Sequence, residues 1–220
     1  LNTEYALVLS PDTVCDENFF EKVKYYLNKN LDYTIIGSSY KDDKIHATYG
    51  FFPENLKKKL HYKSPNSSLL KVDWVAGCCM IMNLEKFNKQ KIFDEKFFLY
   101  FEEFNLCKKI SLKNENVFSS KDLLISHLGF KSSFSPNPIL RDEANKLREW
   151  HWMWSMFYFY RNNYGYLFAL KKTIGKLIKY LIKTVYFSLT FNKALKNKFK
   201  CRFLGLLNSM LGKKSSYRID

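Results

Sequence analysis

The first forty residues constrain the fold most strongly, because short apolar runs alternate with one helical pattern. Residues 5–9 are an apolar run that stops at the Ser-Pro-Asp-Thr sequence of residues 10–13, which predicts a buried strand followed by a turn. Aromatic and aliphatic residues then recur at helical spacing to about Asn28, with Asp16 as the expected N-cap. Residues 33–39 predict a second strand. The order strand, helix, strand is typical of an α/β unit.

The middle of the chain adds further short elements. Residues 41–70 are polar and irregular, which predicts a long loop or short edge strands. Residues 72–82 are apolar with Gly77 at their centre, and we expect a strand that passes another segment closely there, since glycine inside a strand often marks a close backbone approach. A helix is predicted to end near Leu112, and residues 117–126 predict one or two more strands.

The C-terminal part is expected to be helical and carries most of the charge. Residues 141–163 predict one long aromatic helix, and residues 167–189 and 194–211 have apolar residues at helical spacing with lysines between them. Residues 165–220 contain 13 Lys or Arg against one acidic residue, a charge of +12, whereas residues 1–164 carry +3. No window of about 18 residues is free of charge, so we expect amphipathic helices on an anionic membrane surface rather than a spanning helix.

Composition also limits the compartment and the partners. Only five of the 36 basic residues are Arg, which is poor material for bidentate contacts to nucleic acid, so no nucleic-acid partner is expected. The five cysteines form no metal-binding spacing, and their use indicates a reducing, cytoplasmic compartment. They are Cys15, Cys78, Cys79, Cys107 and Cys201.

Two residues near predicted strand ends are candidates for binding. Asp12 follows a buried strand, at the edge where open α/β sheets bind their ligands, although most such aspartates are turn or cap residues. His127 follows another predicted strand, and a lone histidine is more often structural than a ligand.

Two adjacent acids are candidates for proton transfer. Glu102 and Glu103 stand directly behind an apolar aromatic run at the start of a helix. Either they are acids that interact favourably with the helix dipole, or one of them is a general base in a pocket that holds little water. Trp74 and Gly77 fit either simple packing or a binding surface.

Four segments in this order resemble the family 2 inverting glycosyltransferases, and among them the bacterial rhamnosyltransferase-like enzymes. The third segment is the most specific, because it resembles the family's FDExFFxYxEDxDLC text over about fifteen consecutive positions. The resemblance covers roughly residues 4–165, including the aromatic helix and its end at residues 160–165. The four segments are residues 9–13 (LSPDT), 72–77 (VDWVAG), 93–107 (FDEKFFLYFEEFNLC) and 127–132 (HLGFKS).

The resemblance implies a fold and a reaction. The fold would be α/β, the C-terminal portion of a GT-A mixed sheet with flanking helices, followed by the basic helical tail. The reaction would move a sugar, with rhamnose suggested by the subgroup, from a nucleoside-diphosphate donor to a hydroxyl of a glycan or lipid-linked glycan, with inversion. The enzyme would be held in the cytoplasm, peripheral on the inner face of the cell membrane.

The resemblance also implies roles for single residues. Ser10, Pro11 and Asp12 would lie at the donor, with Asp12 and His127 near a Mg²⁺ or Mn²⁺ ion that meets the diphosphate. Glu103 falls on the presumed base.

Other residues would act around that base. Glu102 would share the role of the base or take it over. Trp74, Gly77 and Tyr100 would line the acceptor side.

Three departures from the family pattern favour a second hypothesis. Glu103 stands where the family has Asp, Asn105 stands where a second Asp is usual, and Ser10 replaces an acid or Asn. The family's nucleotide-binding first part is expected to precede Leu1, so the chain as given would bind a nucleotide sugar poorly. The alternative is a non-catalytic or truncated glycosyltransferase-like protein that acts as a membrane-surface or interaction module.

These inferences divide the chain by role. Residues 1–140 would be a partial glycosyltransferase domain without its first strands, and residues 141–164 a helix packed on that domain. Residues 165–220 would attach the protein to the membrane surface.

Overall fold

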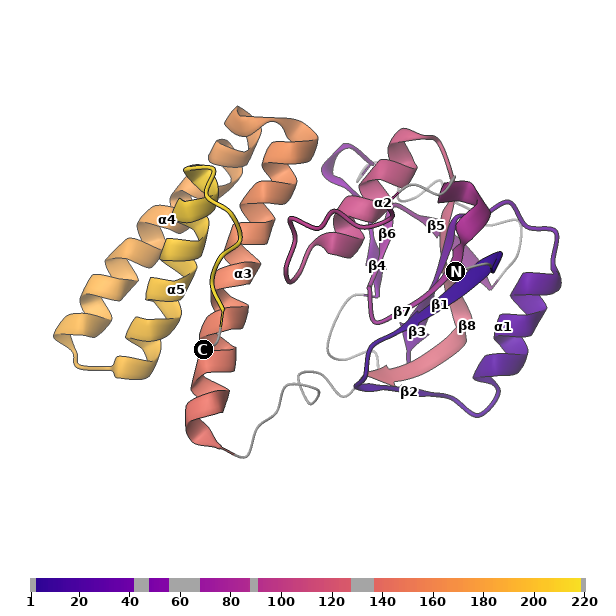
Figure 1. The fold of residues 1–220 in the computed structure, drawn as a ribbon, viewed down its shortest axis with the longest axis horizontal. Helices are drawn as coiled ribbons and strands as arrows, with labels where there is room; N and C mark the ends of the chain where they lie inside the picture. The colour runs from indigo at the N-terminus through magenta and orange to yellow at the C-terminus, as the bar shows by residue number, and fades with distance from the viewer. Residues whose placement is uncertain (1–2, 42–47, 56–67, 88–90, 128–136, 219–220) are drawn as a thin grey trace. The chain divides into compact units, whose positions relative to one another are not determined.

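The chain forms a sheet unit and a helical unit in a computed structural model (Figure 1). The structure describes residues 3–41, 48–55, 68–87, 91–127 and 137–218. The sheet unit comprises residues 1–93 and 106–132, and the helical unit comprises residues 94–105 and 133–220. Each unit is described by itself below.

The sheet unit is built on a six-stranded mixed sheet, in which five strands follow the order β1-β7-β3-β8-β2 and β5 pairs with β8. β3 and β8 run parallel, and the other neighbours in the sheet are antiparallel. The strands are β1 (Tyr5–Leu9), β2 (Thr13–Cys15), β3 (Ile35–Tyr40), β5 (Leu69–Val72), β7 (Cys79–Asn83) and β8 (Val117–His127). The α/β class with a mixed sheet and helices is therefore confirmed.

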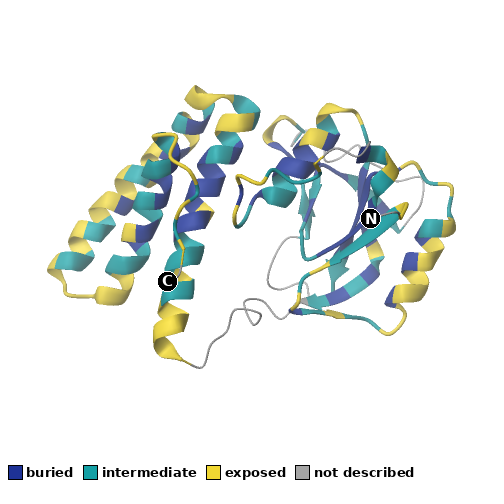
Figure 2. Ribbon diagram, viewed as in Figure 1, coloured by how far each residue is buried: buried dark blue, intermediate teal, exposed yellow. Residues whose placement is uncertain are grey.

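One helix and a small second sheet accompany this sheet. α1 (Phe19–Asn28) buries Phe19, Val23 and Tyr26, which recur every three to four residues and so share one face of the helix. They pack with Ile36 and Ile81 of the sheet in one apolar core, the buried region of this unit in Figure 2. β4 (Tyr49–Gly50) pairs with β6 (Trp74–Val75), and a short 3-10 helix covers Leu84–Phe87.

Three local expectations in this unit are wrong. β1 is half-buried rather than buried, because it lies at the end of the strand order and pairs with β7. Asp16 does not cap α1 through its side chain; its carbonyl accepts the Phe19 N–H, and its carboxylate binds Lys41 at 2.7 Å. Gly77 lies in a turn between β6 and β7, because residues 72–82 comprise the end of β5, all of β6 and most of β7 rather than one strand.

The helical unit contains three long helices that pack on one another (Figure 1). α3 begins where the Asn137 side chain accepts the Ile139 N–H at 2.9 Å, with Pro138 in the first turn. The Asn192 side chain caps α5 in the same way. The helices are α3 (Pro138–Tyr164), α4 (Tyr166–Leu189) and α5 (Lys193–Met210), as the helical pattern predicts.

Two glycines shape this bundle. Gly165 joins α3 to α4 as a single residue with φ 87° and ψ 162°, a conformation that L side chains rarely adopt. Gly205 lets α5 approach α3 closely, because a Cβ there would lie 2.2 Å from the Trp150 carbonyl oxygen. Glu149 adds ion pairs to Lys198, at 3.4 Å, and to Arg202.

α2 (Glu102–Leu112) falls in both units, its first four residues with the helical unit and the rest with the sheet unit. The compact units therefore do not coincide with the division at residues 140 and 165 expected from the sequence, which is a division by role and stays a prediction. Among the described residues, none of the helices combines the length and the apolar character needed to cross a membrane.

Candidate functional site

Several predicted segments of the sheet unit meet where β1, β3 and β8 end. The Ser10 N–H donates to the Cys78 carbonyl at 2.9 Å, which ties the turn after β1 to the residues before β7. Thr13 pairs with His127, the last residue of β8. The Tyr40 hydroxyl at the end of β3 lies 3.4 Å from the Cys78 sulfur. Open α/β folds bind ligands at the carboxyl ends of their strands, so this end of the sheet is a candidate binding site.

Asp12 is the acid at this sheet end. It is only 7% exposed, and the Ser10 hydroxyl donates to its Oδ1 atom at 2.5 Å. Ser10, which replaces an acid of the family pattern, therefore orients the remaining carboxylate. The following residue, Thr13, begins β2 and pairs with His127 of β8, so Asp12 lies in the turn directly before the strand that pairs with the end of β8. Within the described part of the chain, no three His, Cys, Asp or Glu side chains gather as a metal centre.

Trp74 packs against a neighbouring strand, and Gly77 lies in a turn. The Trp74 ring covers Gly50 on the paired strand, where a Cβ would lie 2.4 Å from the ring. Asp73 beside it accepts the Phe52 N–H at 2.6 Å and so fixes the neighbouring loop. Gly77 stands in the turn that leads to the Cys78 carbonyl. Their expected contact with an acceptor stays a prediction.

A strained turn precedes α2 in the helical unit. Tyr100 and Phe101 have φ values of 67° and 68°, in the left-handed region that aromatic residues rarely occupy. α3 holds them: the Tyr100 and Phe101 rings lie 5.1 Å and 5.3 Å from the Trp152 ring, and the Ser155 hydroxyl donates to the Leu99 carbonyl at 2.8 Å. Burial raises the pKa of Tyr100 to about 12, so its hydroxyl keeps its proton.

Glu102 and Glu103 form the first turn of α2 directly after this strained turn. Each residue is half-buried, but its Oε2 atom is fully buried and has no hydrogen-bond partner among the described residues. Burial, and then the neighbouring Glu102 charge, raises the pKa of Glu103 to about 8. Burial also raises the pKa of Glu102. A helix N-terminus alone would stabilise the ionised acids and lower these pKa values, so burial outweighs the helix dipole here.

Asn105, at one of the positions that depart from the family pattern, is fixed by α3. It is 1% exposed, and its Oδ1 atom accepts from the Asn163 side chain at 3.0 Å. An aspartate could accept this hydrogen bond in the same way, but it would add a third carboxylate to the first turns of α2. The asparagine therefore keeps the contact to α3 without a further charge beside Glu102 and Glu103.

Sequence reasoning missed several residues of the sheet end. Thr13 lies inside a predicted segment, and its hydroxyl donates to the Cys78 carbonyl at 3.3 Å. Tyr40 and Cys78 carry no sequence signal for this position, because strand pairing brings them there. Residues 128–132 of the fourth segment lie outside the described residues.

Part of the sequence is similar to a known transferase. Over 130 residues the chain is 26% identical to a low-salt glycan biosynthesis hexosyltransferase of Haloferax volcanii. The match covers 53% of this chain and 40% of that protein's length. No family model matches the sequence. The chain therefore matches less than half of the length of that hexosyltransferase.

Proposed function

We propose that this chain is part of an inverting glycosyltransferase in which Glu103 is the general base. The observation that carries this proposal is the buried, unpartnered Oε2 atom of a carboxyl group whose pKa is raised to about 8, placed behind a strained turn. Hydrogen bonds from the backbone N–H groups of Glu103 and Phe104 lower the pKa of Glu103, but burial and the Glu102 charge outweigh them. Strained backbone is retained where the surrounding structure holds it, and it is often found at functional sites. The similarity to a hexosyltransferase supports the same class of reaction.

The proposed reaction needs a base on the acceptor side. The acceptor oxygen forms a bond to the anomeric carbon, and the bond from that carbon to the donor's diphosphate breaks with its electron pair leaving on the diphosphate. The acceptor proton passes to Glu103, through a transition state similar to that of glycosidases. A base with a pKa near the working pH accepts this proton most efficiently.

The donor side is assigned to the sheet end. Ser10, Pro11 and Asp12 would contact the diphosphate, and Asp12 with His127 would hold Mg²⁺ or Mn²⁺. A carboxylate oxygen oriented by Ser10 suits such a hard cation, and the donor oxygens would complete its coordination. When bound, the cation would offset the negative charge that develops on the leaving group.

The acceptor side is assigned to Trp74, Gly77 and Tyr100. Trp74 offers a half-buried aromatic surface, and Tyr100 a neutral hydroxyl next to the base. A glycan or lipid-linked glycan is the proposed acceptor, and rhamnose the proposed sugar. Family 2 membership and a GT-A fold belong to the same proposal.

We further propose that α4 lies on the cytoplasmic face of an anionic membrane. Large apolar side chains along α4 are exposed, among them Ile178 (53%), Ile182 (61%) and Val185 (53%). Lysines stand between them, including exposed Lys176 and Lys179. Exposed apolar residues interleaved with cations suit the boundary between acyl chains and anionic headgroups.

The test of the reaction is sugar transfer by the protein at its full natural length. With Mn²⁺ and a panel of nucleotide sugars, it should release nucleoside diphosphate, and Asp12→Ala and Glu103→Ala should abolish that release. Asp16→Asn is the matched control, because Asp16 pairs with Lys41 outside the proposed site. Retained transfer in both alanine variants would contradict the site assignment. Absence of release with every donor would favour the non-catalytic alternative.

The membrane proposal is tested separately with point variants. Removing residues 166–220 would also remove the helices that pack on α3, so Ile178→Ser with Ile182→Ser is the better change. This double variant should lose most binding to vesicles that contain phosphatidylglycerol. Leu112→Ser is the control, because Leu112 is more exposed (69%) than either isoleucine but lies in the sheet unit. Unchanged vesicle binding in the double variant would refute the attachment.

A further inference from the structure

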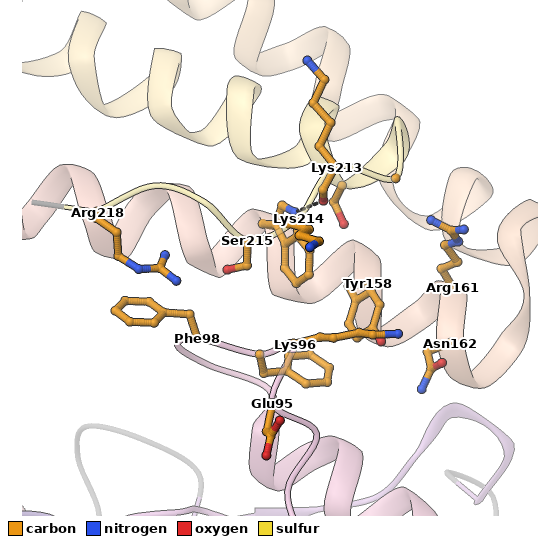
Figure 3. A pocket seen from close by; sticks show the side chains of 14 residues that line it. Glu95, Lys96, Phe98, Tyr158, Arg161, Asn162, Lys213, Lys214, Ser215 and Arg218 are labelled. Carbon is orange, nitrogen blue, oxygen red and sulfur yellow. Dashed lines mark hydrogen bonds between the residues drawn. The ribbon is translucent and has the colours of Figure 1, made fainter.

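The helical unit contains a cavity of about 830 Å³ that the proposed reaction does not use. Its walls come from residues 95–98, from α3, and from residues 209–218 at the end of α5 and beyond it (Figure 3). Ligand sites in proteins commonly have volumes of roughly 300–1,000 Å³, so the cavity is large enough for a small organic ligand.

Positive charge dominates the lining of this cavity. Five basic residues line it and Glu95 is its acidic residue; the Lys213 side chain extends away from the others, which leaves four cations, Lys96, Arg161, Lys214 and Arg218 (Figure 3). None of the four makes an ion pair with a carboxylate among the described residues. Four unpaired cations around one cavity repel one another, so the arrangement is most stable when an anion neutralises them.

The wall formed by the C-terminal segment is fixed in place by α3. The Trp154 ring N–H donates to the Lys213 carbonyl at 3.0 Å, and Tyr217 stacks on Trp150 with ring centres 6.0 Å apart. The two ring nitrogens of His151 lie 3.0 Å from the Ser215 hydroxyl and 2.8 Å from the Tyr217 carbonyl. The backbone that carries Lys214 and Arg218 is therefore held by hydrogen bonds and stacking.

Two polar groups in the lining, the Ser209 hydroxyl and the Arg218 guanidinium, have surroundings that favour contact with a ligand. The Ser209 side chain lines the cavity and is only 3% exposed, and its buried Oγ atom has no hydrogen-bond partner among the described residues. Such a hydroxyl costs free energy unless something accepts its hydrogen bond. The Arg218 guanidinium lies over the Phe98 ring, 3.7 Å from its centre, and this contact orients that cation in the lining of the cavity (Figure 3).

We propose that this cavity binds a phosphate-bearing ligand, with a diphosphate group between the four cations. Two arginines and two lysines match the charge and the several acceptor oxygens of a diphosphate, and Ser209 supplies a neutral donor. The aromatic walls, including Trp154 and Tyr158, would contact the organic part of the ligand. The inference does not depend on the transferase reaction, because binding is measured without turnover.

The first experiment uses inorganic pyrophosphate and the full chain in titration calorimetry. Wild type should bind pyrophosphate more tightly than inorganic phosphate, and Arg161→Gln with Lys214→Gln should weaken pyrophosphate binding roughly ten- to hundredfold. Lys193→Gln with Lys200→Gln removes the same charge from exposed sites outside the cavity and should leave the affinity within about twofold. Ser209→Ala should weaken binding about fivefold, since it removes one neutral hydrogen bond.

A second experiment distinguishes the two sources of a diphosphate. Vesicles of phosphatidylcholine carry either phosphatidylglycerol or a polyprenyl diphosphate at equal charge. If the Arg161/Lys214 variant loses binding only to the polyprenyl diphosphate vesicles, the ligand is the headgroup of a lipid. If it loses pyrophosphate binding but keeps all vesicle binding, the ligand is soluble.

The inference would be overturned by either of two results. One is the absence of saturable pyrophosphate binding by the wild type. The other is an equal loss of pyrophosphate affinity in the Arg161/Lys214 variant and in the Lys193/Lys200 control. That result would mean that the net charge of the protein, and not the cavity, determines binding. A protein that binds pyrophosphate but transfers no sugar would refute the proposed reaction and leave this inference standing.

Discussion

The sheet unit and the helical unit differ in how well they satisfy their buried polar atoms. In the sheet unit, buried Asp73 accepts two hydrogen bonds and Asp12 accepts one from Ser10. Among the described residues, five buried side-chain atoms lack a partner, and four of them are in the helical unit. They belong to Glu102, Glu103, Asn105 and Ser209, whereas the fifth is the Tyr33 hydroxyl of the sheet unit. Asp12 and Asp73 of the sheet unit are thus held by hydrogen bonds within the protein, whereas these four side chains of the helical unit keep a buried polar atom without a partner among the described residues.

The largest effect is expected from replacing Glu103, the proposed base, because this change removes one of the buried carboxyl groups without a partner. Glu103→Gln should lower the transfer rate by roughly 10²- to 10⁴-fold, the usual contribution of a general base. It should also raise stability at pH 7.5 by about 1–3 kcal/mol, because a carboxyl whose folded pKa lies above its unfolded value of about 4.5 destabilises the fold as the pH rises. Transfer kinetics and thermal unfolding measure the two effects.

Glu21→Gln is the matched control for that variant. Glu21 is also a first-turn acid, in α1, but it is exposed. It should change neither the rate nor the stability appreciably. A Glu103→Gln protein that keeps its rate and loses stability would show that Glu103 is structural.

The next largest effect is expected in the packing of the helical unit. Gly205→Ala should lower the free energy of unfolding by about 1–3 kcal/mol, because the new Cβ would meet the Trp150 carbonyl and force α5 away from α3. Gly175→Ala should raise it by roughly 0.5–1 kcal/mol, since nothing lies within 4 Å of a Cβ there and alanine favours a helix. Denaturant titration compares the two, and equal effects would contradict the close approach.

A smaller effect is expected on the pH dependence of transfer. The rate should rise with pH through an apparent pKa of about 8 that belongs to the Glu102/Glu103 pair, because the base must be ionised. Glu102→Gln removes a like charge, so the transfer rate should rise at a pH lower by up to about one unit. The shift is limited because burial is the larger cause of the raised pKa of Glu103. A rise at higher pH in this variant would contradict the interaction between the two carboxyl groups.

The smallest effect concerns the C-terminal segment. Burial lowers the pKa of His151, with the Arg218 charge adding to it, so the neutral ring is the folded form. Stability is therefore complete above the unfolded pKa of about 6.5 and is lost as the pH falls from there toward the lower folded pKa. The melting temperature should fall more between pH 7.5 and pH 5 in wild type than in His151→Gln. Equal losses would show that His151 does not fasten this segment.

Local pattern accounts for most of the elements that could be predicted from the sequence. The apolar run of residues 5–9 is β1, and the helix expected to end near Leu112 does so. Helical spacing in residues 167–189 likewise marks α4. α4 buries Ala169, Thr173 and Tyr180, which recur at helical spacing, so its periodicity is visible in the sequence.

The failures are positions where a contact from elsewhere decides the structure. Asp16 binds Lys41 instead of capping α1, and Gly77 serves a turn that ends one strand and starts another. Neither contact leaves a local pattern. The half-buried state of β1 depends on its place in the strand order, which periodicity does not give.

The candidate site was predictable in part. Asp12, Glu102 and Glu103 stand out because strand ends and helix starts carry recognisable residues. The basic cavity does not stand out, because residues 95–98 and 209–218 are brought together only by packing against α3. Its lysines and arginines form no distinct motif among the 36 basic residues of the chain, so the sequence does not mark them.

The single-residue joint at Gly165 has a mechanical consequence. The Gly165 N–H donates to the Arg161 carbonyl at the end of α3, and its own carbonyl accepts from Ala169 in the first turn of α4, so no slack separates the two helices. Both backbone polar groups of the joint are therefore used by the two helices that it connects. Because α3 also holds the turn before Glu102 through Ser155, the proposed membrane helix and the proposed base are attached to the same helix.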